Sequence, residues 1–261
     1  MTDYALGREG AEEAELTRLG LLAELHDPLT ERQLDAIGVE PGWRCLDAGA
    51  GAGAVTRLLA ARVGSTGSVL AIDLDTRLLD GVASETVEVR RQDVLADPLP
   101  QATFDLAHAR ALLMHLPARL VALQRLHAAV RPGGWLAICE PDFTSIDLAP
   151  SSPGWRRTFS AFCDATVATG WDPRYGARLQ ADLEAVELTD IKTERCGGDR
   201  VQGGSPWTGL FAATLERLRD RLRTLGADDQ DLDETQRLLR EPSMHFTHAT
   251  TWLSSGRREQ P

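Results

Sequence analysis

The sequence predicts an α/β fold in which helices cover both faces of a mainly parallel sheet. From residue 43 onward, short apolar runs alternate with longer segments of helical character, and such alternation requires crossover connections between parallel strands. The first apolar run leads directly into a glycine-rich turn, as at a strand-to-helix junction. The chain has 261 residues, 43% of them hydrophobic, which is enough apolar material for a sizeable core.

Seven strands are expected from the apolar runs, and seven suffice for one open sheet. They are predicted at residues 43–48, 67–73, 86–91, 103–108, 134–140, 188–197 and 244–253. The segments between and beside them predict helices at residues 54–62, 75–83, 116–130, 153–168, 174–186, 207–225 and 232–240.

Two further helices are expected before the first strand. Leucines recur at helical spacing within residues 8–26, and Pro28 interrupts the pattern. Residues 30–33 (TERQ) then form a capping box that opens a second helix. We therefore expect an N-terminal helical segment or lid over residues 1–38 and one domain over residues 39–261.

Two stretches lie outside the simple alternation of strands and helices. Residues 141–180 are rich in Pro, Ser and aromatic side chains, and residues 199–240 are helical in character. Because both follow late strands, we expect them to be insertions that cover a cleft.

Composition excludes several classes of function. The formal net charge of −11 disfavours binding to nucleic acid, whose phosphates an acidic chain repels. The four cysteines form no CxxC pair and no Cys/His cluster, so no metal site is expected. No apolar run approaches the length of a membrane span, and the polar N-terminus does not resemble a signal peptide. We expect a cytoplasmic protein without a membrane partner, and the sequence leaves a homodimer open.

The sharpest signal is the run Asp47–Gly53 (DAGAGAG), which follows an apolar strand and precedes a helix. Glycines let the chain turn tightly and let a ligand approach the backbone closely. Gly49, Gly51 and Ala54 also satisfy the dinucleotide pattern G-x-G-x-x-G/A. Asp73 ends the next predicted strand, where an acid would bind the ribose diol of a dinucleotide or of another nucleoside cofactor. This part of the motif does not decide between cofactors.

Asp47 favours a cofactor without phosphate over a dinucleotide. A carboxylate directly before the loop would lie close to the pyrophosphate of a dinucleotide, and like charges there are unfavourable. The same carboxylate suits a cofactor that carries an ammonium group and no phosphate. S-adenosylmethionine (SAM) is such a molecule.

Five segments in order resemble the class I SAM-dependent methyltransferases, in particular the group that acts on ubiquinone-type and natural-product substrates. They are LDAGAGAG, VLAIDLD, VRRQDVLADPLP, FDLAHARALLMHLP and the lead RPGG-WLAI into the fifth strand. The resemblance is strong over about residues 40–140 and looser elsewhere. Ala50 and Ala52 depart from the Cys and the Thr or Ser that are common in the group.

The resemblance implies a fold and a set of cofactor contacts. The fold is a three-layer, Rossmann-like sheet of seven strands in the order 3-2-1-4-5-7-6, with strand seven antiparallel. Asp47 would hold the methionine ammonium, the glycines would give backbone contacts, Asp73 would bind the ribose, and Leu74 would pack on the adenine. The residues implied are Asp47, Ala48, Gly49, Gly51, Asp73, Leu74, Asp93 and Val94 at the adenine edge, and His108 through its backbone carbonyl.

The candidates for catalysis are His115, in the segment LLMHLP, and Glu140, at the end of the fifth strand. In related sugar O-methyltransferases a His and an acid at these places act as base and partner. Imidazole suits hydroxyl activation near neutral pH. Glu140 would orient the imidazole or bind a substrate hydroxyl.

These observations favour a methyltransferase for a small-molecule acceptor, O- or N-directed, on a metabolite or natural product. Two alternatives stay open at this point. One is an NAD-dependent oxidoreductase. The other is a protein that keeps the SAM pocket without methyl transfer, such as a cyclase or a binding module, because methyl transfer leaves no obligatory catalytic signature.

Overall fold

A computed structural model describes residues 12–146 and 152–260 of the chain, which form two compact units. The sheet unit consists of residues 26–141, 175–196 and 251–261, and the helical unit holds the described parts of residues 1–25, 142–174 and 197–250. The predicted division at residues 38 and 39 stays a prediction.

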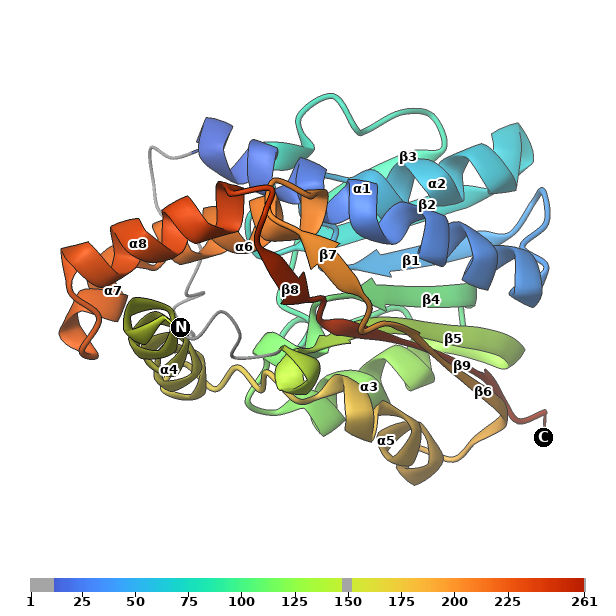
Figure 1. Ribbon diagram of the computed structural model, residues 1–261. Coiled ribbons are helices and arrows are strands. Elements are labelled where there is room, and N and C mark those ends of the chain that lie inside the picture. The colour runs from blue at the N-terminus through green and yellow to red at the C-terminus, as the bar shows by residue number, and fades with distance from the viewer. Residues whose placement is uncertain (1–11, 147–151, 261) are drawn as a thin grey trace. The chain divides into compact units, whose positions relative to one another are not determined.

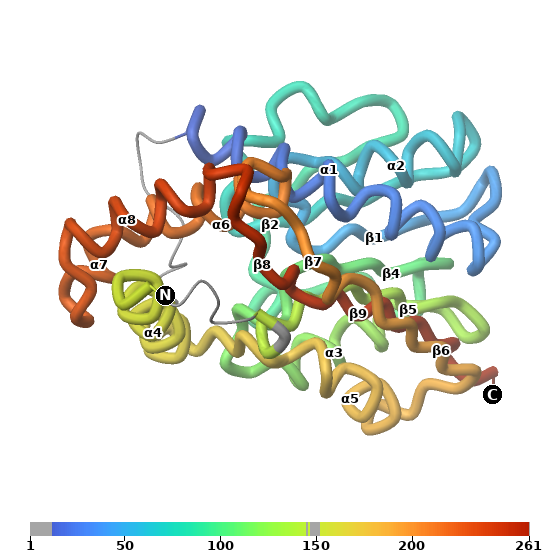
Figure 2. Tube along the Cα trace, viewed as in Figure 1, coloured from blue at the N-terminus to red at the C-terminus, as the bar shows by residue number. Residues whose placement is uncertain are grey.

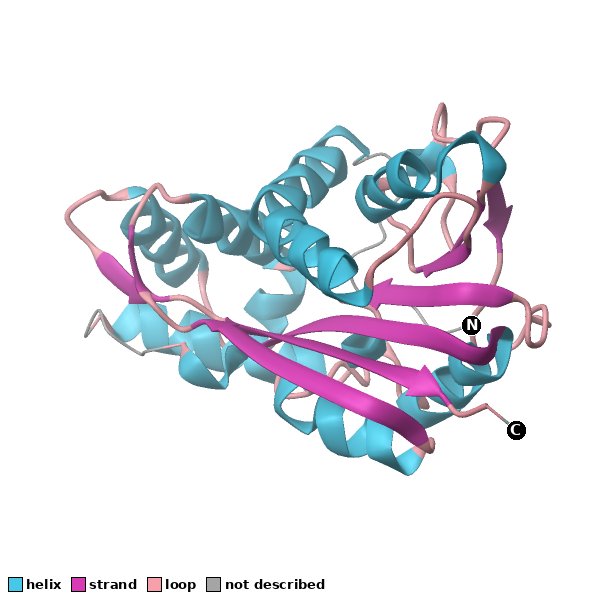
Figure 3. Ribbon diagram, turned by 90° about the vertical axis from the view of Figure 1, so that its right-hand side faces the viewer, coloured by secondary structure: helices cyan, strands magenta, loops and turns pink. Residues whose placement is uncertain are grey.

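The larger sheet has seven strands, side by side in Figure 3, in the order β3-β2-β1-β4-β5-β9-β6. The strands from β3 to β5 are parallel to their neighbours. Arg258, near the end of β9, donates to the carbonyl of Val130 at the start of β5, so β9 runs antiparallel. The predicted fold class and strand order are confirmed. The bounds are β1 Arg44–Ala48, β2 Ser68–Asp73, β3 Val87–Arg91, β4 Phe104–Arg110, β5 Val130–Asp142, β6 Leu188–Gly197 and β9 Thr250–Arg258.

Helices cover both faces of this sheet (Figure 3). The chain passes from β1 through α2 (Ala54–Val63) to β2, and α2 packs on both strands (Figure 2). α3 (Arg119–Ala129) packs on β4 and contacts α5 (Leu179–Ala185). The 3-10 turns are η1 Gly64–Thr66, η2 Arg77–Leu79, η3 Leu113–His115, η4 Phe143–Ser145 and η5 Gly176–Arg178.

The helix predicted at residues 75–83 is wrong, because only the short turn η2 forms there. The Asp75 carboxylate accepts the backbone N–H of Arg77 and also pairs with its guanidinium, which favours a local turn over a helix. Gly81 then adopts a φ of +77°, a left-handed conformation that ends the segment.

The break predicted at Pro28 is also wrong, since α1 continues from Glu12 to Ile37 with Pro28 inside it. Proline disfavours a helix interior by about 3 kcal/mol. Side-chain contacts on either side of Pro28 offset this cost: Arg110 donates to Asp27 at 2.7 Å and to the Thr30 hydroxyl at 3.1 Å.

The helical unit has an aromatic core. Its helices are α4 (Pro153–Val167), α6 (Pro206–Arg217), α7 (Arg219–Thr224) and α8 (Asp229–Arg240). Between them the rings of Trp155, Phe162, Phe211 and Phe246 are buried, with the Trp155 and Phe246 centroids 5.1 Å apart. The helix predicted at residues 207–225 is two helices that meet at Leu218.

The last predicted strand, 244–253, is wrong in its bounds. Residues 245–247 form β8 (His245–Thr247), which pairs with β7 (Arg200–Gln202) in a separate two-stranded sheet of the helical unit. The main sheet receives β9 instead, which extends to Arg258. Small polar residues such as Ser254 lie buried in β9, and they hide its apolar pattern in the sequence.

None of the helices in the described part of the chain combines the length and apolar character that crossing a membrane requires.

Candidate functional site

The glycine-rich loop lies where β1 ends, and the arrowheads of β1 and β4 point the same way (Figure 1). The carboxyl ends of parallel neighbours share one edge of the sheet, where ligands bind in open α/β folds. Gly49, Gly51 and Gly53 have φ values of +72°, +58° and +78°. Residues with a Cβ adopt this conformation at a cost, so the three glycines give the loop its shape.

Asp73, at the end of β2, is bonded directly to this loop. One of its carboxylate oxygens accepts the Gly51 N–H at 2.8 Å, and the other accepts the Asp75 N–H at 3.0 Å. Burial raises the pKa of Asp73, while these two N–H groups lower it. The residue is only partly buried, so each oxygen keeps acceptor capacity for a further hydroxyl donor. This is the geometry expected of a ribose-binding acid.

Asp47 is 2% exposed at the end of β1, beneath the loop. Its Oδ2 accepts the Thr56 hydroxyl at 2.6 Å, and its Oδ1 lies 3.6 Å from Nδ1 of His108. Neither ring nitrogen of His108 has a hydrogen-bond partner among the described residues. The Thr56 hydroxyl therefore holds Asp47, while His108 lies beside it without a hydrogen bond, and Ala48 is fully buried.

His108 lies inside β4 and not at its end, which corrects the predicted position. It is fully buried, and in the register it stands between Asp47 of β1 and Ala137 of β5. The strand continues to Arg110 because residues 109 and 110 still pair with β5. The residues that leave the sheet at this edge begin at Ala111, whose φ is +50°.

The predicted adenine contacts lie after β2 and β3. Leu74 is 42% exposed, so its side chain is accessible to a ligand at this edge of the sheet. Asp93 is half-buried, and its Oδ1 accepts the Leu95 N–H at 2.8 Å. Val94 is buried, and Arg125 of α3 donates to its carbonyl at 2.7 Å.

Glu140 lies inside β5, which continues to Asp142, and not at its end as predicted. It is fully buried and faces the turn η3. Its Oε1 accepts the N–H groups of Leu112 at 3.0 Å and Leu113 at 2.7 Å, and its Oε2 lies 3.4 Å from the Met114 nitrogen. Burial raises the pKa of Glu140 to about 8, while the three N–H groups lower it. His115 ends the same turn and is half-buried. The catalytic roles of His115 and Glu140 stay predictions.

Sequence reasoning missed three residues that shape this edge: Thr56, Leu112 and Arg125. Thr56 had only a weak signal, since it is a small polar residue in the largely apolar segment AVTRLLA, which also contains Arg57. Leu112 had none, because its contact with Gly49 joins residues that are distant in the sequence. A Cβ on Gly49 would lie 3.0 Å from Cδ1 of Leu112.

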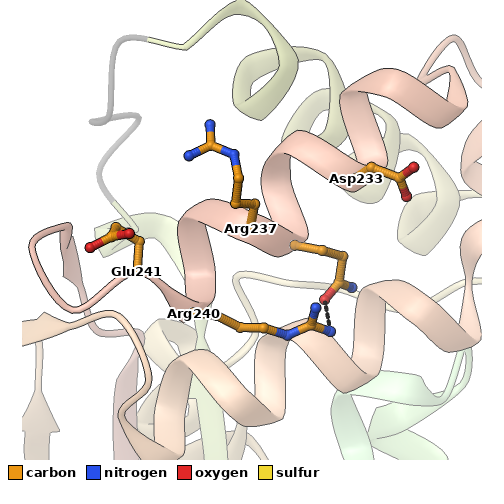
Figure 4. A pocket seen from close by; sticks show the side chains of 5 residues that line it. Asp233, Arg237, Arg240 and Glu241 are labelled. Atoms are coloured by element: carbon orange, nitrogen blue, oxygen red, sulfur yellow. Dashed lines mark hydrogen bonds between the residues drawn. The ribbon is translucent and has the colours of Figure 1, made fainter.

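A surface depression on the helical unit is not lined by any of the residues described above. It lies on α8 in the helical unit and is lined by Asp233, Gln236, Arg237, Arg240 and Glu241 (Figure 4). Among the described residues, no three His, Cys, Asp or Glu side chains are grouped so that they could hold a metal ion.

Comparisons with known proteins agree with this geometry. The family model of the methyltransferase domain matches residues 46–138. Methyltransferase str2 of Strobilurus tenacellus is 31% identical over 186 residues, covering 69% of this chain and 66% of the relative. Nocamycin O-methyltransferase of Saccharothrix syringae is 34% identical over 128 residues, 45% of either chain. The matches thus span about half to two-thirds of these relatives' own length.

A solved structure shows the same fold. It is phosphoethanolamine N-methyltransferase 2 of Haemonchus contortus in complex with phosphomonomethylethanolamine and S-adenosylhomocysteine (SAH). The TM-score is 0.59 at 15% identity, over 95% of this chain and 59% of that one.

The residues at the loop fit SAM as the cofactor. Two carboxylates flank the loop, Asp47 beneath it and Asp73 bonded to it, and they suit an ammonium group and a ribose diol. A Cβ on Gly49 would lie 3.0 Å from Cδ1 of Leu112, so the loop needs a glycine at this position. The match to the methyltransferase domain argues against the alternative of an NAD-dependent oxidoreductase. The chain belongs to the class I SAM-dependent methyltransferases.

Proposed function

We propose that this chain transfers the methyl group of SAM to a small-molecule acceptor, at an oxygen or nitrogen atom of a metabolite or natural product. The observation that carries the proposal is the Asp73 carboxylate bonded to Gly51 of the glycine loop, with Asp47 directly beneath. The relative named for an O-methylated natural product supports the acceptor class.

When bound, SAM supplies a methyl group on a positively charged sulfur. The residues of this chain then bind and orient the two reactants, since alignment supplies much of the rate of such a displacement. Asp73 is placed to accept the ribose hydroxyls, and Leu74 to cover the adenine. Our proposed cofactor site consists of Asp47, Ala48, Gly49, Gly51, Asp73, Leu74, Asp93 and Val94. His108 would contact the methionine portion of SAM through its backbone carbonyl.

His115 is our proposed general base, for an acceptor that must lose a proton. It follows the turn that leaves β4, at the edge of the sheet that carries the loop. A base at this place would draw a proton from an acceptor hydroxyl or ammonium near neutral pH. His115→Ala should then lower kcat while the affinity for SAM stays unchanged. Full turnover by this variant would remove His115 from the mechanism.

The function is tested first by ligand binding. Thermal shifts are recorded with SAM, SAH and NAD, because a ligand that binds only the folded state raises the Tm. We expect both adenosyl compounds to stabilise the chain and NAD to leave it unchanged. Stabilisation by NAD alone would overturn the proposal.

Product analysis with candidate acceptors follows. Appearance of SAH together with an acceptor heavier by one methyl group supports transfer. Conversion of the acceptor with no consumption of SAM would indicate instead a family member that keeps the pocket for another reaction.

A further inference from the structure

The structure assigns Glu140 a positioning role: we infer that its buried carboxylate holds the turn 112–114 against the glycine loop and so shapes the methionine end of the cofactor site. This inference rests on the proposed function, because it concerns the same site. It differs from proton transfer, in which Glu140 would act on the acceptor.

The register of the sheet brings Glu140 to this turn. Arg110 of β4 stands opposite Cys139 of β5, and the Ala111 N–H donates to the Cys139 carbonyl at 2.9 Å. Ala111 then takes a φ of +50°, so the chain leaves the sheet beside the next residue of β5, which is Glu140.

The carboxylate satisfies backbone groups that lie in the interior. Leu113 is fully buried and Met114 is 1% exposed, so their N–H groups have little access to water. A buried donor without a partner is costly, and a carboxylate that accepts several N–H groups compensates part of its own desolvation. The turn and the acid therefore depend on each other.

Residues 175 and 176 pack against the backbone of Glu140 and exclude solvent there. Gly176 lies so near that a Cβ there would be 2.9 Å from the Glu140 carbonyl oxygen, and the neighbouring Tyr175 is fully buried. With no exposed surface and hydrogen bonds from the turn to both of its oxygens, the carboxylate is poorly placed to exchange a proton with an acceptor.

The turn 112–114 contacts the glycine-rich loop through the side chain of Leu112. The side chain of Leu112 lies beside Gly49, where Cβ and both Cδ atoms are 3.0 to 3.3 Å from the position of an added Cβ. At its other end the turn holds His115, whose N–H donates to the Leu112 carbonyl at 3.0 Å. By holding the turn, Glu140 thus fixes the position of the Leu112 side chain beside Gly49. It also fixes the backbone of His115, the proposed base.

Two substitutions separate positioning from proton transfer. Glu140→Met removes both acceptor oxygens at similar length, whereas Glu140→Gln keeps one oxygen for the Leu112 and Leu113 N–H groups. If Glu140 positions the turn, calorimetry should show SAH affinity reduced at least about tenfold in Glu140→Met and less than about threefold in Glu140→Gln. If Glu140 transfers a proton, both variants should lose kcat equally with SAH affinity unchanged, and this result overturns the inference.

The control is Asp105→Leu. Asp105, near the start of β4, also accepts a backbone N–H, from Arg44 at 2.7 Å, but at the opposite edge of the sheet. We expect this variant to lower the Tm without changing the affinity for SAH. An equal loss of affinity in the control would overturn the inference, because general destabilisation would then explain both variants.

A double-mutant cycle covers the case in which Glu140→Met does not fold. Leu112→Ala leaves the carboxylate and the turn in place and removes only the side chain beside Gly49. We expect it to weaken SAH binding several-fold, and to keep this full effect in the Glu140→Gln background, because the remaining oxygen still holds the turn there. Wild-type affinity in Leu112→Ala overturns the inference while the proposed function stands. If the wild-type chain itself binds neither SAM nor SAH, the proposed function fails and the inference falls with it.

Discussion

The same interaction occurs twice at one edge of the sheet, at the turns that follow β1 and β4, with different consequences. Asp73 accepts the N–H of Gly51 in the loop after β1, and Glu140 accepts the N–H groups of the turn after β4. In each case a carboxylate at or near the end of one strand accepts N–H groups of the turn that leaves a neighbouring strand.

The difference between the two acids is their exposure. Asp73 is partly buried, with one N–H on each oxygen, and can still accept hydroxyl donors. Glu140 is fully buried and occupied by the turn. The comparison teaches that the place of a carboxylate in the topology does not decide its role. A carboxylate whose oxygens can accept further hydrogen bonds can bind a ligand, whereas one whose oxygens are already occupied by backbone N–H groups positions a turn.

The largest effect is expected when Asp73, the partly buried member of this pair, is replaced. Asp73→Ala deletes the proposed ribose acceptor and the support of the loop. Because hydrogen bonds to a charged group contribute about 1.5–3 kcal/mol each, SAM affinity should fall at least about tenfold in calorimetry. Glu88→Ala, which removes an exposed acid of β3 paired with Arg90, is the control and should bind normally. Unchanged affinity in Asp73→Ala would contradict the ribose assignment.

A second test addresses the contact between the two turns. Gly49→Ala places a Cβ beside Leu112 at a φ of +72°, and a left-handed conformation costs a residue with a Cβ about 1–2 kcal/mol. Gly81→Ala has the same backbone cost, at a φ of +77°, but nothing within 4 Å of the added atom. The Tm should fall in both variants and further in Gly49→Ala, and SAM affinity only in Gly49→Ala. Equal losses in stability and in affinity would show that the Leu112 contact has no role.

A third test concerns the support of Asp47. Thr56→Val removes the hydroxyl that donates to Oδ2 at 2.6 Å and leaves a buried carboxylate short of one donor, at a cost of about 1–3 kcal/mol. Chemical denaturation should show this loss, with SAM affinity weakened a few-fold as Asp47 reorients. Thr56→Ser, which keeps the hydroxyl, should restore both, and a failure of this rescue would point to lost packing as the cause.

The sequence predicted the first of the two turns far better than the second. The loop after β1 is specified by adjacent residues, since its glycines and its acid stand in one short run and each has a local physical reason. Asp73 could be added because it ends the next strand. The strand order was accessible for the same reason, through the resemblance of those local motifs.

The turn after β4 depends on contacts that no local pattern contains. Glu140 and Leu113 are 27 residues apart in the chain, and their hydrogen bond exists only once β4 and β5 are in register. His108 was placed at a strand end because its apolar run is short, whereas pairing with β5 extends the strand to Arg110. The split of residues 244–258 between two sheets likewise follows from the pairing of β8 with β7.

The last test concerns a dependence of stability on pH to which the Glu140 carboxyl contributes. Burial raises the pKa of this acid to about 8 in the folded state, above the value of about 4.3 for an exposed glutamate. Between these two values the folded chain binds more protons at this site than the unfolded chain. Its contribution to the free energy of unfolding is therefore fully present below about pH 4 and declines as the pH rises towards 8.

Glu140→Gln cannot ionise and should lack this decline. The measurement is the difference in free energy of unfolding between the wild-type chain and Glu140→Gln from pH 5 to 8, because all other titrating groups cancel in that difference. The wild-type chain should lose stability relative to the variant as the pH rises. A flat difference would mean that the three N–H donors of the turn already offset the cost of burying the charge, and the turn would then bind Glu140 as a carboxylate throughout this range.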